Sequence, residues 1–146
     1  ERGLRGGTEN TTGILGLEKA LSDIKIDKEK KLKKLSDLKQ YLVSQLQKNN
    51  FDFSINGNTS SSSPAIINVT LKTKKDISML LFNLDLEGIA ISGGSACTSG
   101  SNKGSHVLRH IGTPMDQPAI RISFSTYNTK EEVDYLIKVF KKLLSI

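Results

Sequence analysis

The side chain best suited to chemistry in these 146 residues is the only cysteine, Cys97. It lies in the run SGGSACTSGS at residues 92–101, where every neighbour is small. Glycines and hydroxyl side chains predict a mobile, exposed loop with many hydrogen-bond donors, whereas an inert cysteine normally lies among apolar side chains. The pattern therefore predicts a reactive thiol. A small residue in a flexible turn, without a chemical role, is the alternative.

Reactivity of Cys97 requires a thiolate, and a free thiol of pKa about 8.5 is only partly ionised at neutral pH. Lys103, His106 and Arg109 follow Cys97 closely in the sequence and could supply positive charge. None of them has to contact the thiol, because a mobile loop can also carry Cys97 to a substrate that is activated elsewhere. Both routes stay open on the sequence alone.

Arg121 is a second candidate, because it lies in a predicted strand at residues 119–124. The apolar residues Ile120, Ile122 and Phe124 share one face of this strand, so Arg121 points to the other face. A guanidinium there can hold a carboxylate through two parallel hydrogen bonds, which an ammonium group cannot reproduce. An ordinary surface arginine, or one paired with a local acid, is the alternative.

Thr8 is a third candidate, because it follows two glycines just before a predicted helix. Backbone N–H groups at a helix N-terminus, together with a hydroxyl group, can bind a phosphate. Thr8 could equally be the N-cap of that helix.

Two other motifs do not predict a site. The glycines, serines and lysine of residues 94–105 lack the spacing of a nucleotide-binding P-loop. His106 and His110 are four residues apart, but with Cys97 as the only other soft ligand they make an incomplete metal site. We interpret the histidine pair as an exposed helix face and predict no metal.

The net charge of +6 is concentrated in one segment, where acidic residues are interspersed. The lysines of this segment are Lys25, Lys28, Lys30, Lys31, Lys33 and Lys34. Aromatic residues make up only 5% of the chain and tryptophan is absent, so a solvated helix face is favoured over a nucleic-acid interface. One cysteine suits a reducing compartment, and no apolar run approaches the roughly 20 residues that span a bilayer. We expect a soluble cytoplasmic protein without a membrane partner.

The helices and strands that hydrophobic periodicity predicts alternate irregularly along the chain, which indicates a small α+β domain. The apolar stripe of residues 14–46 predicts two consecutive helices or one bent helix, with the stripe packed in the core, and Asn49-Asn50 ends this region. The strands are expected at residues 51–55, 65–71, 89–92 and 119–124. Another helix is expected to start at residues 73–76, with one apolar face between residues 77 and 84, and to stop at Gly88. Further helices are expected at residues 105–111 and 133–144, the last after a capping box at residues 129–132.

Three separate blocks of the sequence resemble the cysteine desulfurases of the NifS/IscS type, within the class V aminotransferase family. These blocks are GIAISGGSACTSGSNKGSHVLRHIG at residues 88–112, ERGLRGGTENTTGILGLEKA at residues 1–20, and IRISFSTYNTKEEVDYL at residues 120–136. The resemblance covers essentially the whole chain, although residues 24–63 are generic. It implies the small C-terminal domain of a fold-type I transferase that depends on pyridoxal phosphate (PLP), with a short, mostly antiparallel sheet packed with helices.

The resemblance also implies a role for each candidate residue. Cys97 would take sulfur from cysteine as a persulfide, Arg121 would bind the substrate carboxylate, and Thr8 would reach the PLP phosphate of the other subunit in a homodimer. Residues 1–12 would be the connecting segment and residues 13–146 the small domain. No lysine precedes Lys19, so the lysine that forms the PLP Schiff base is expected upstream of this chain. We therefore expect a C-terminal part of a longer enzyme that is inactive by itself.

Three functions remain open at this stage. The leading hypothesis is the sulfur-transfer part of a cysteine desulfurase, which converts L-cysteine to L-alanine and supplies iron-sulfur cluster assembly, thio-cofactors or tRNA thiolation. Its partner would be a sulfur-acceptor or iron-sulfur scaffold protein. The alternatives are a class V aminotransferase-like domain without persulfide chemistry, and a basic adaptor that binds nucleic acid through the lysine-rich helix.

Overall fold

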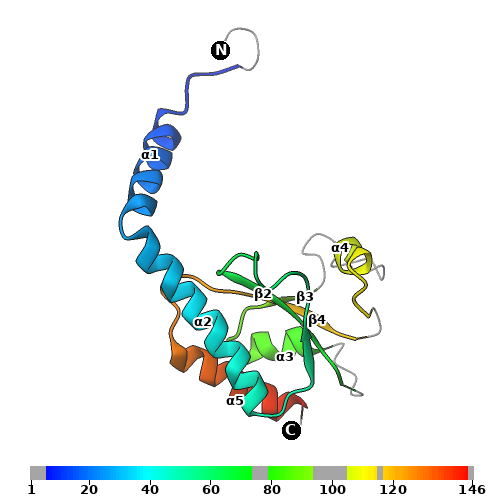
Figure 1. The fold of residues 1–146 in the computed structure, drawn as a ribbon. Helices are drawn as coiled ribbons and strands as arrows, with labels where there is room; N and C mark the ends of the chain where they lie inside the picture. The colour runs from blue at the N-terminus through cyan, green and yellow to red at the C-terminus, as the bar shows by residue number, and fades with distance from the viewer. Residues whose placement is uncertain (1–5, 74–78, 94–104, 115–116, 145–146) are drawn as a thin grey trace.

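A computed structural model describes residues 6–73, 79–93, 105–114 and 117–144 (Figure 1). Within them the chain forms five helices and four strands. In chain order these are α1 (Thr11–Lys25), α2 (Lys28–Lys48), β1 (Phe53–Ile55), β2 (Ile66–Leu71), α3 (Leu80–Leu86), β3 (Ser92–Gly93), α4 (His106–His110), β4 (Ala119–Ser123) and α5 (Lys130–Leu144). The predicted α+β class is confirmed.

The four strands form one sheet in the order β1-β2-β4-β3, and every neighbouring pair is antiparallel. Side chains alternate between the two faces of the sheet. Ile67, Val69 and Leu71 of β2 and Ile120 and Ile122 of β4 are buried, so they define the face that belongs to the core. The expected alternation of β2 and β4 is therefore confirmed.

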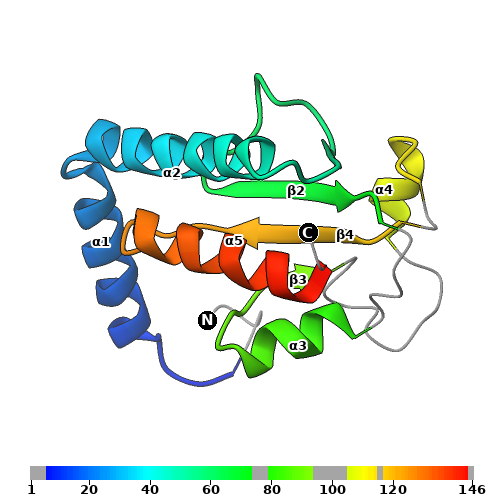
Figure 2. The same cartoon turned by 90° about the horizontal axis from the view of Figure 1, so that it is seen from below.

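Helices α2, α3 and α5 cover this apolar face side by side (Figure 2). Their inward residues have helical spacing and join the strand residues in one core. The helical members of this core are Leu38, Leu42, Leu46, Leu80, Leu84, Val133, Leu136, Ile137, Val139, Phe140 and Leu144. The other face of the sheet has no such helical layer, and α4 lies on that side in Figure 1.

Local hydrogen bonds fix the ends of the two long core helices. After α2, Asn50 adopts a left-handed conformation (φ 57°), and the N–H groups of Asn50 and Phe51 donate to the carbonyls of Gln47 and Leu46. This is a Schellman motif, in which the buried Phe51 and Leu46 belong to the same core cluster. The motif confirms the predicted end of the helix at Asn49-Asn50.

The predicted capping box begins α5. The N–H of Thr129 donates to Oε2 of Glu132 at 3.0 Å, and the N–H of Glu132 donates to Oγ1 of Thr129 at 3.4 Å. Asn128 also donates to Glu132 at 2.9 Å. These hydrogen bonds, first the one from Asn128, lower the pKa of Glu132 below its ordinary value.

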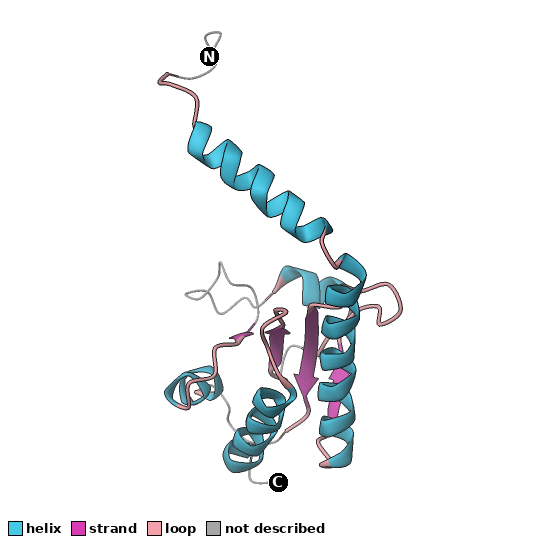
Figure 3. Cartoon of the chain, turned by 90° about the vertical axis from the view of Figure 1, so that its left-hand side faces the viewer, coloured by secondary structure: helices cyan, strands magenta, loops and turns pink. Residues whose placement is uncertain are grey.

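Helix α1 departs from the expectation that its apolar stripe packs in the core. It projects away from the sheet, and none of its residues is buried (Figure 3). The exposed apolar residues of the stripe are Ile14, Leu17, Leu21 and Ile24. The prediction was wrong for this helix because the sheet is already covered by α2, α3 and α5, and α1 points beyond its edge.

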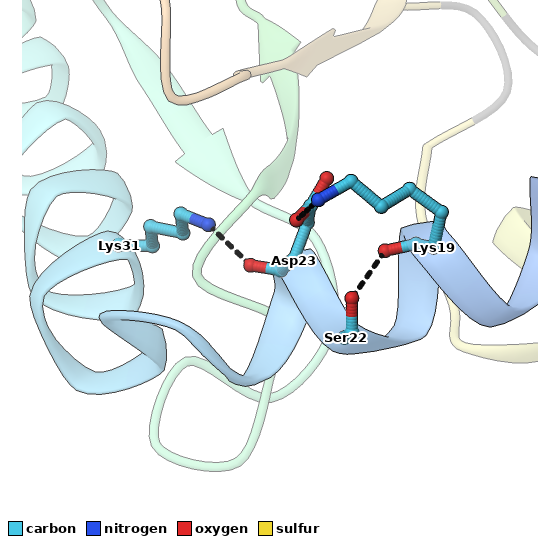
Figure 4. Close-up of polar contacts among 4 residues, drawn as sticks. All are labelled: Lys19, Ser22, Asp23 and Lys31. Atoms are coloured by element: carbon cyan, nitrogen blue, oxygen red, sulfur yellow. Dashed lines mark hydrogen bonds and ion pairs between the residues drawn. The ribbon is translucent and has the colours of Figure 1, made fainter.

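The bend between α1 and α2 sets this direction. Asp27 adopts a left-handed conformation (φ 56°), which breaks the helix. Lys31 then reaches back from α2 and donates its Nζ to the backbone carbonyl of Asp23 at 2.7 Å, while Lys19 pairs with the Asp23 carboxylate (Figure 4). The two consecutive helices that were one of the predicted possibilities are therefore the observed arrangement.

Two element boundaries also differ from the predictions. The strand expected at residues 89–92 is only the pair Ser92–Gly93. Helix α3 begins at Leu80, whereas the pattern placed the helix start at residues 73–76, and residues 74–78 lie outside the described part. Ile89 and Ile91 are half-buried against the core without strand pairing, which explains why their apolar character indicated a longer strand.

Asn50 provides a test of the Schellman motif. We expect Asn50→Val to lower the free energy of unfolding by about 1–2 kcal/mol, because a β-branched residue is strained in the left-handed region. Asn50→Gly removes the same side chain without strain and should leave stability unchanged or slightly raised. Urea unfolding of both variants measures the difference, and equal stability of the two would contradict the role of φ at this position.

Glu132 provides a test of the capping box through pH. Its lowered pKa means that the folded state gains stability above the unfolded-state pKa and loses it as the pH falls through the folded-state pKa. The wild-type chain should therefore melt above Glu132→Gln at neutral pH, and the two melting temperatures should converge in acid. Thermal unfolding between about pH 7 and 3 measures this. Glu18→Gln on α1 is the control, and a gap that persists in acid would argue against the charged cap.

Candidate functional site

The site is built on the polar face of the two central strands. Asn68 of β2 lies opposite Arg121 of β4, and Ser92 of β3 lies opposite Arg121 on its other side. Asn68 and Arg121 alternate with buried apolar residues, so they lie on the face that α2, α3 and α5 do not cover. Ser92 shares this face because side chains of directly paired residues point to the same side of a sheet. Arg121 therefore lies in the middle of this face, between two polar neighbours.

The hydrogen-bond pattern brings Asn68 and Arg121 especially close. The N–H of Leu71 donates to the carbonyl of Pro118, and the N–H of Phe124 donates to that of Ala65. Hydrogen-bonded pairs alternate with non-hydrogen-bonded pairs along an antiparallel ladder, which places Asn68 and Arg121 at a non-hydrogen-bonded pair. At such a pair the Cα atoms are only about 4.5 Å apart and the side chains are neighbours.

The Arg121 side chain is exposed, and it makes no hydrogen bond or ion pair with the part of the chain that the structure describes. The local acid pair that sequence reasoning left open is thus not found there. A guanidinium with no acidic partner, on the polar face of a sheet, can bind a carboxylate from outside.

A polar network supports the same face. Asn56 donates through Nδ2 to Oδ1 of Asn68 at 2.6 Å and to Oγ1 of Thr70 at 2.8 Å. The Thr113 hydroxyl donates to Oδ1 of Asn56 at 3.3 Å, which ties the segment after α4 to the sheet. Thr70 and Thr113 are buried, so this end of the polar face is covered and ordered around Asn56.

Sequence reasoning did not identify Asn68, Asn56, Thr70 or Thr113 as site residues. A usable signal was present in β2, where Asn68 and Thr70 alternate with apolar residues as Arg121 does in β4. What the sequence could not supply is the pairing of the two strands, which places these polar residues on one face.

The predicted nucleophile Cys97 and the neighbouring Lys103 lie outside the described residues. The chain enters that segment from β3, whose Ser92 and Gly93 pair with Arg121 and Ile120. The strand that precedes the cysteine-bearing segment is thus a direct neighbour of the strand that carries Arg121.

Thr8 precedes α1, whose first residue is Thr11, and the N-terminal end of α1 lies far from these strands (Figures 1 and 3). The helix begins at Thr11 and its N-cap is Asn10, whose side chain accepts from the N–H of Gly13 at 3.0 Å. The alternative role of Thr8 as the N-cap was therefore wrong. Within one copy of this chain, Thr8 and Arg121 do not form a shared site.

The histidines and the lysine-rich segment behave as surface features. His106 and His110 are both exposed on α4, and the described residues contain no group of three or more potential metal ligands. Arg109 of the same helix has an interaction partner. Lys30, Lys33, Lys34 and Lys130 line a shallow hollow of about 380 Å³, and Lys33 is paired there with Asp37 at 2.9 Å. Its mixed charge fits the predicted solvated helix face.

Comparison with known proteins identifies the family. The aminotransferase class-V model matches residues 1–136. This chain belongs to the aminotransferase class-V family. It is 36% identical over 146 residues to a cysteine desulfurase IscS of Dictyoglomus turgidum, an alignment that covers 99% of the chain and 37% of the relative.

Solved structures agree with this assignment. A NifS-like protein has a TM-score of 0.78 and 33% identity, covering 99% of this chain and 36% of that one. A NifS-like protein from Rickettsia africae has a TM-score of 0.80 and 26% identity, covering 98% and 37%. The chain thus spans a little over a third of the length of these class-V proteins, and the predicted resemblance is confirmed.

Membership of the class-V family implies the use of PLP. The described residues do not by themselves form a site for it, since the phosphate-binding candidate Thr8 precedes α1, the carboxylate-binding candidate Arg121 lies in β4, and the start of α1 is far from β4 (Figure 1). In the described part of the chain, no helix is long and apolar enough to cross a membrane.

Proposed function

We propose that this chain is part of a PLP-dependent cysteine desulfurase, in which it supplies the sulfur-accepting cysteine and the substrate carboxylate clamp. One observation carries the proposal: Arg121, which has no partner among the described residues, lies on the polar face of β4, next to the strand that precedes the only cysteine of the sequence. The class-V family and the desulfurase relatives support the reaction.

In this proposal, Arg121 binds and orients cysteine. Its guanidinium holds the carboxylate through two charge-assisted hydrogen bonds, which fix both the position and the direction of the substrate. The polar face offers no competing acid in the described residues, so the guanidinium is available to an incoming carboxylate.

Cys97 accepts the sulfur. Its thiolate attacks the substrate sulfur, the carbon–sulfur bond breaks, and a sulfur–sulfur bond forms on Cys97. The former substrate carbon takes up a proton and leaves as alanine, so atoms and electrons balance without an external oxidant. Cys97 is the fourth residue after Gly93, and a fully extended chain of four residues spans at most about 14 Å.

The cofactor belongs to the complete enzyme. PLP when bound supplies the electron sink that allows the carbon–sulfur bond to break. We propose that Thr8 contributes to its phosphate site in the partner subunit of a homodimer, which agrees with the distance between the start of α1 and β4 in one copy (Figure 1). Residues 1–12 then act as the connecting segment and residues 13–146 as the small domain.

The exposed stripe of α1 fits a larger assembly. Ile14, Leu17 and Leu21 are each more than half exposed here, which is costly for large apolar side chains in water. We propose that residues of the complete enzyme outside this chain cover the stripe. The persulfide would then pass to a sulfur-acceptor or iron-sulfur scaffold protein in the cytoplasm.

A class-V aminotransferase-like protein without persulfide chemistry is the second candidate, and the nucleophile distinguishes the two. In the complete enzyme, we expect Cys97→Ser to bind cysteine as the wild type does, because Arg121 and the cofactor are intact. Sulfide release should be lost, since a hydroxyl cannot form a persulfide. The change in cofactor absorbance on adding cysteine and the sulfide produced are measured in parallel. Release at the wild-type rate would favour the aminotransferase-like function.

Arg121 is tested by the conservative change to lysine. In the complete enzyme, Arg121→Lys should weaken cysteine binding by roughly 1.5–3 kcal/mol, or about ten- to a hundredfold, because a bidentate contact is lost. The free energy of unfolding should change little, because the Arg121 side chain is exposed. The Michaelis constant for cysteine and urea unfolding measure the two effects, with Lys48→Arg as the remote control. An unchanged Michaelis constant would remove Arg121 from the site.

A further inference from the structure

Packing does not explain why an asparagine occupies position 68. Asn68 is only half-buried, it lies in the central strand β2, and its cross-strand neighbour is Arg121 at a non-hydrogen-bonded pair. An apolar or β-branched residue would suit a strand at least as well. The polar side chain therefore has to be explained by what it contacts.

One end of the Asn68 amide is held in place. Its Oδ1 accepts a 2.6 Å hydrogen bond from Nδ2 of Asn56, and Asn56 is itself fixed by Thr70 and Thr113. Thr70 and Thr113 are buried, so the anchor is rigid. The orientation of the Asn68 amide is thus set in advance.

The other end of the amide is left without a partner. Nδ2 of Asn68 makes no hydrogen bond to any residue that the structure describes, although it carries two donor hydrogens. No buried side-chain nitrogen or oxygen of the described chain lacks a partner, so this group is open to solvent. Since Oδ1 is bound to Asn56 from the β1 side, Nδ2 points away from β1.

We propose that Nδ2 of Asn68 is a second donor to the carboxylate that Arg121 binds. A carboxylate has about four acceptor positions, so a bidentate guanidinium leaves room for a further N–H donor. Asn68 and Arg121 come from adjacent strands at the closest type of pair, and both are free to accept an external anion. Asn68 is thereby a specificity residue for an amino acid over the corresponding amine. This inference rests on the proposed desulfurase function.

Two substitutions of Asn68 distinguish the donor role of Nδ2 from the structural role of the side chain. Asn68→Asp keeps the shape and the acceptor for Asn56 but replaces the NH2 donor by a second oxygen. Asn68→Ala removes the donor without adding charge. Asn58→Ala, in an exposed loop away from the sheet face, is the matched control.

The experiment uses the complete PLP-loaded enzyme. We expect both Asn68 variants to raise the Michaelis constant for cysteine by about tenfold or more, with kcat changed less than about twofold. Calorimetric titration with 3-mercaptopropionate, a thiol that keeps the carboxylate but lacks the amine, should show the same loss of affinity. Asn58→Ala should match the wild type in both measurements, and thermal unfolding checks that all variants fold.

Other outcomes overturn the inference. Asn68→Ala could leave both the Michaelis constant for cysteine and the affinity for 3-mercaptopropionate unchanged. This result would show that Nδ2 of Asn68 does not donate to the carboxylate, even if Asn68→Asp, which adds a negative charge, weakened binding. A fall in kcat alone would also contradict it. If the wild-type enzyme itself releases no sulfide from cysteine, the proposed function fails, and this result is distinct from the failure of Asn68 in an active enzyme.

Discussion

The rest of the structure depends on the burial of one face of β2 and β4 under α2, α3 and α5. Val69 and Ile120 are almost completely buried on that face. Because side chains alternate along a strand, a shift of the register by one residue would move these apolar groups into solvent and Arg121 into the core. Both errors are costly, so the packing of the core also fixes which residues face outward.

This constraint links stability to the proposed chemistry. A guanidinium on a loop would lose conformational entropy on binding a substrate, whereas Arg121 lies on a strand whose opposite face is packed. The backbone of Asn68 is fixed by the pairing of β2 with β4, and its side chain is fixed by the hydrogen bond from Asn56. The strand β3 adds the third component, because it pairs with β4 and leads towards Cys97. The proposed carboxylate site thus lies beside the strand after which the segment with the proposed nucleophile begins.

The direction of helix α1 has a different cause from that of the core helices. Its direction is set locally, by the left-handed Asp27 and by the Lys31 bond to the Asp23 carbonyl, and not by contact with the sheet. An apolar stripe that is spaced like a core helix but lies in solvent is consistent with burial against a larger enzyme. The relatives, of which this chain covers a little over a third, support the same conclusion.

The sequence by itself determined the family resemblance, the α+β class, the capping box of α5 and the end of α2 at Asn49-Asn50, because these depend on local spacing and local hydrogen bonds. It also determined that Arg121 alternates with apolar residues. Only the tertiary structure decided that Asn68 lies beside Arg121, that Asn56 orients it, and that the stripe of α1 is exposed. Those features depend on which strands pair and which surfaces remain available after the core is filled, and neither is encoded in the spacing of residues within a single element.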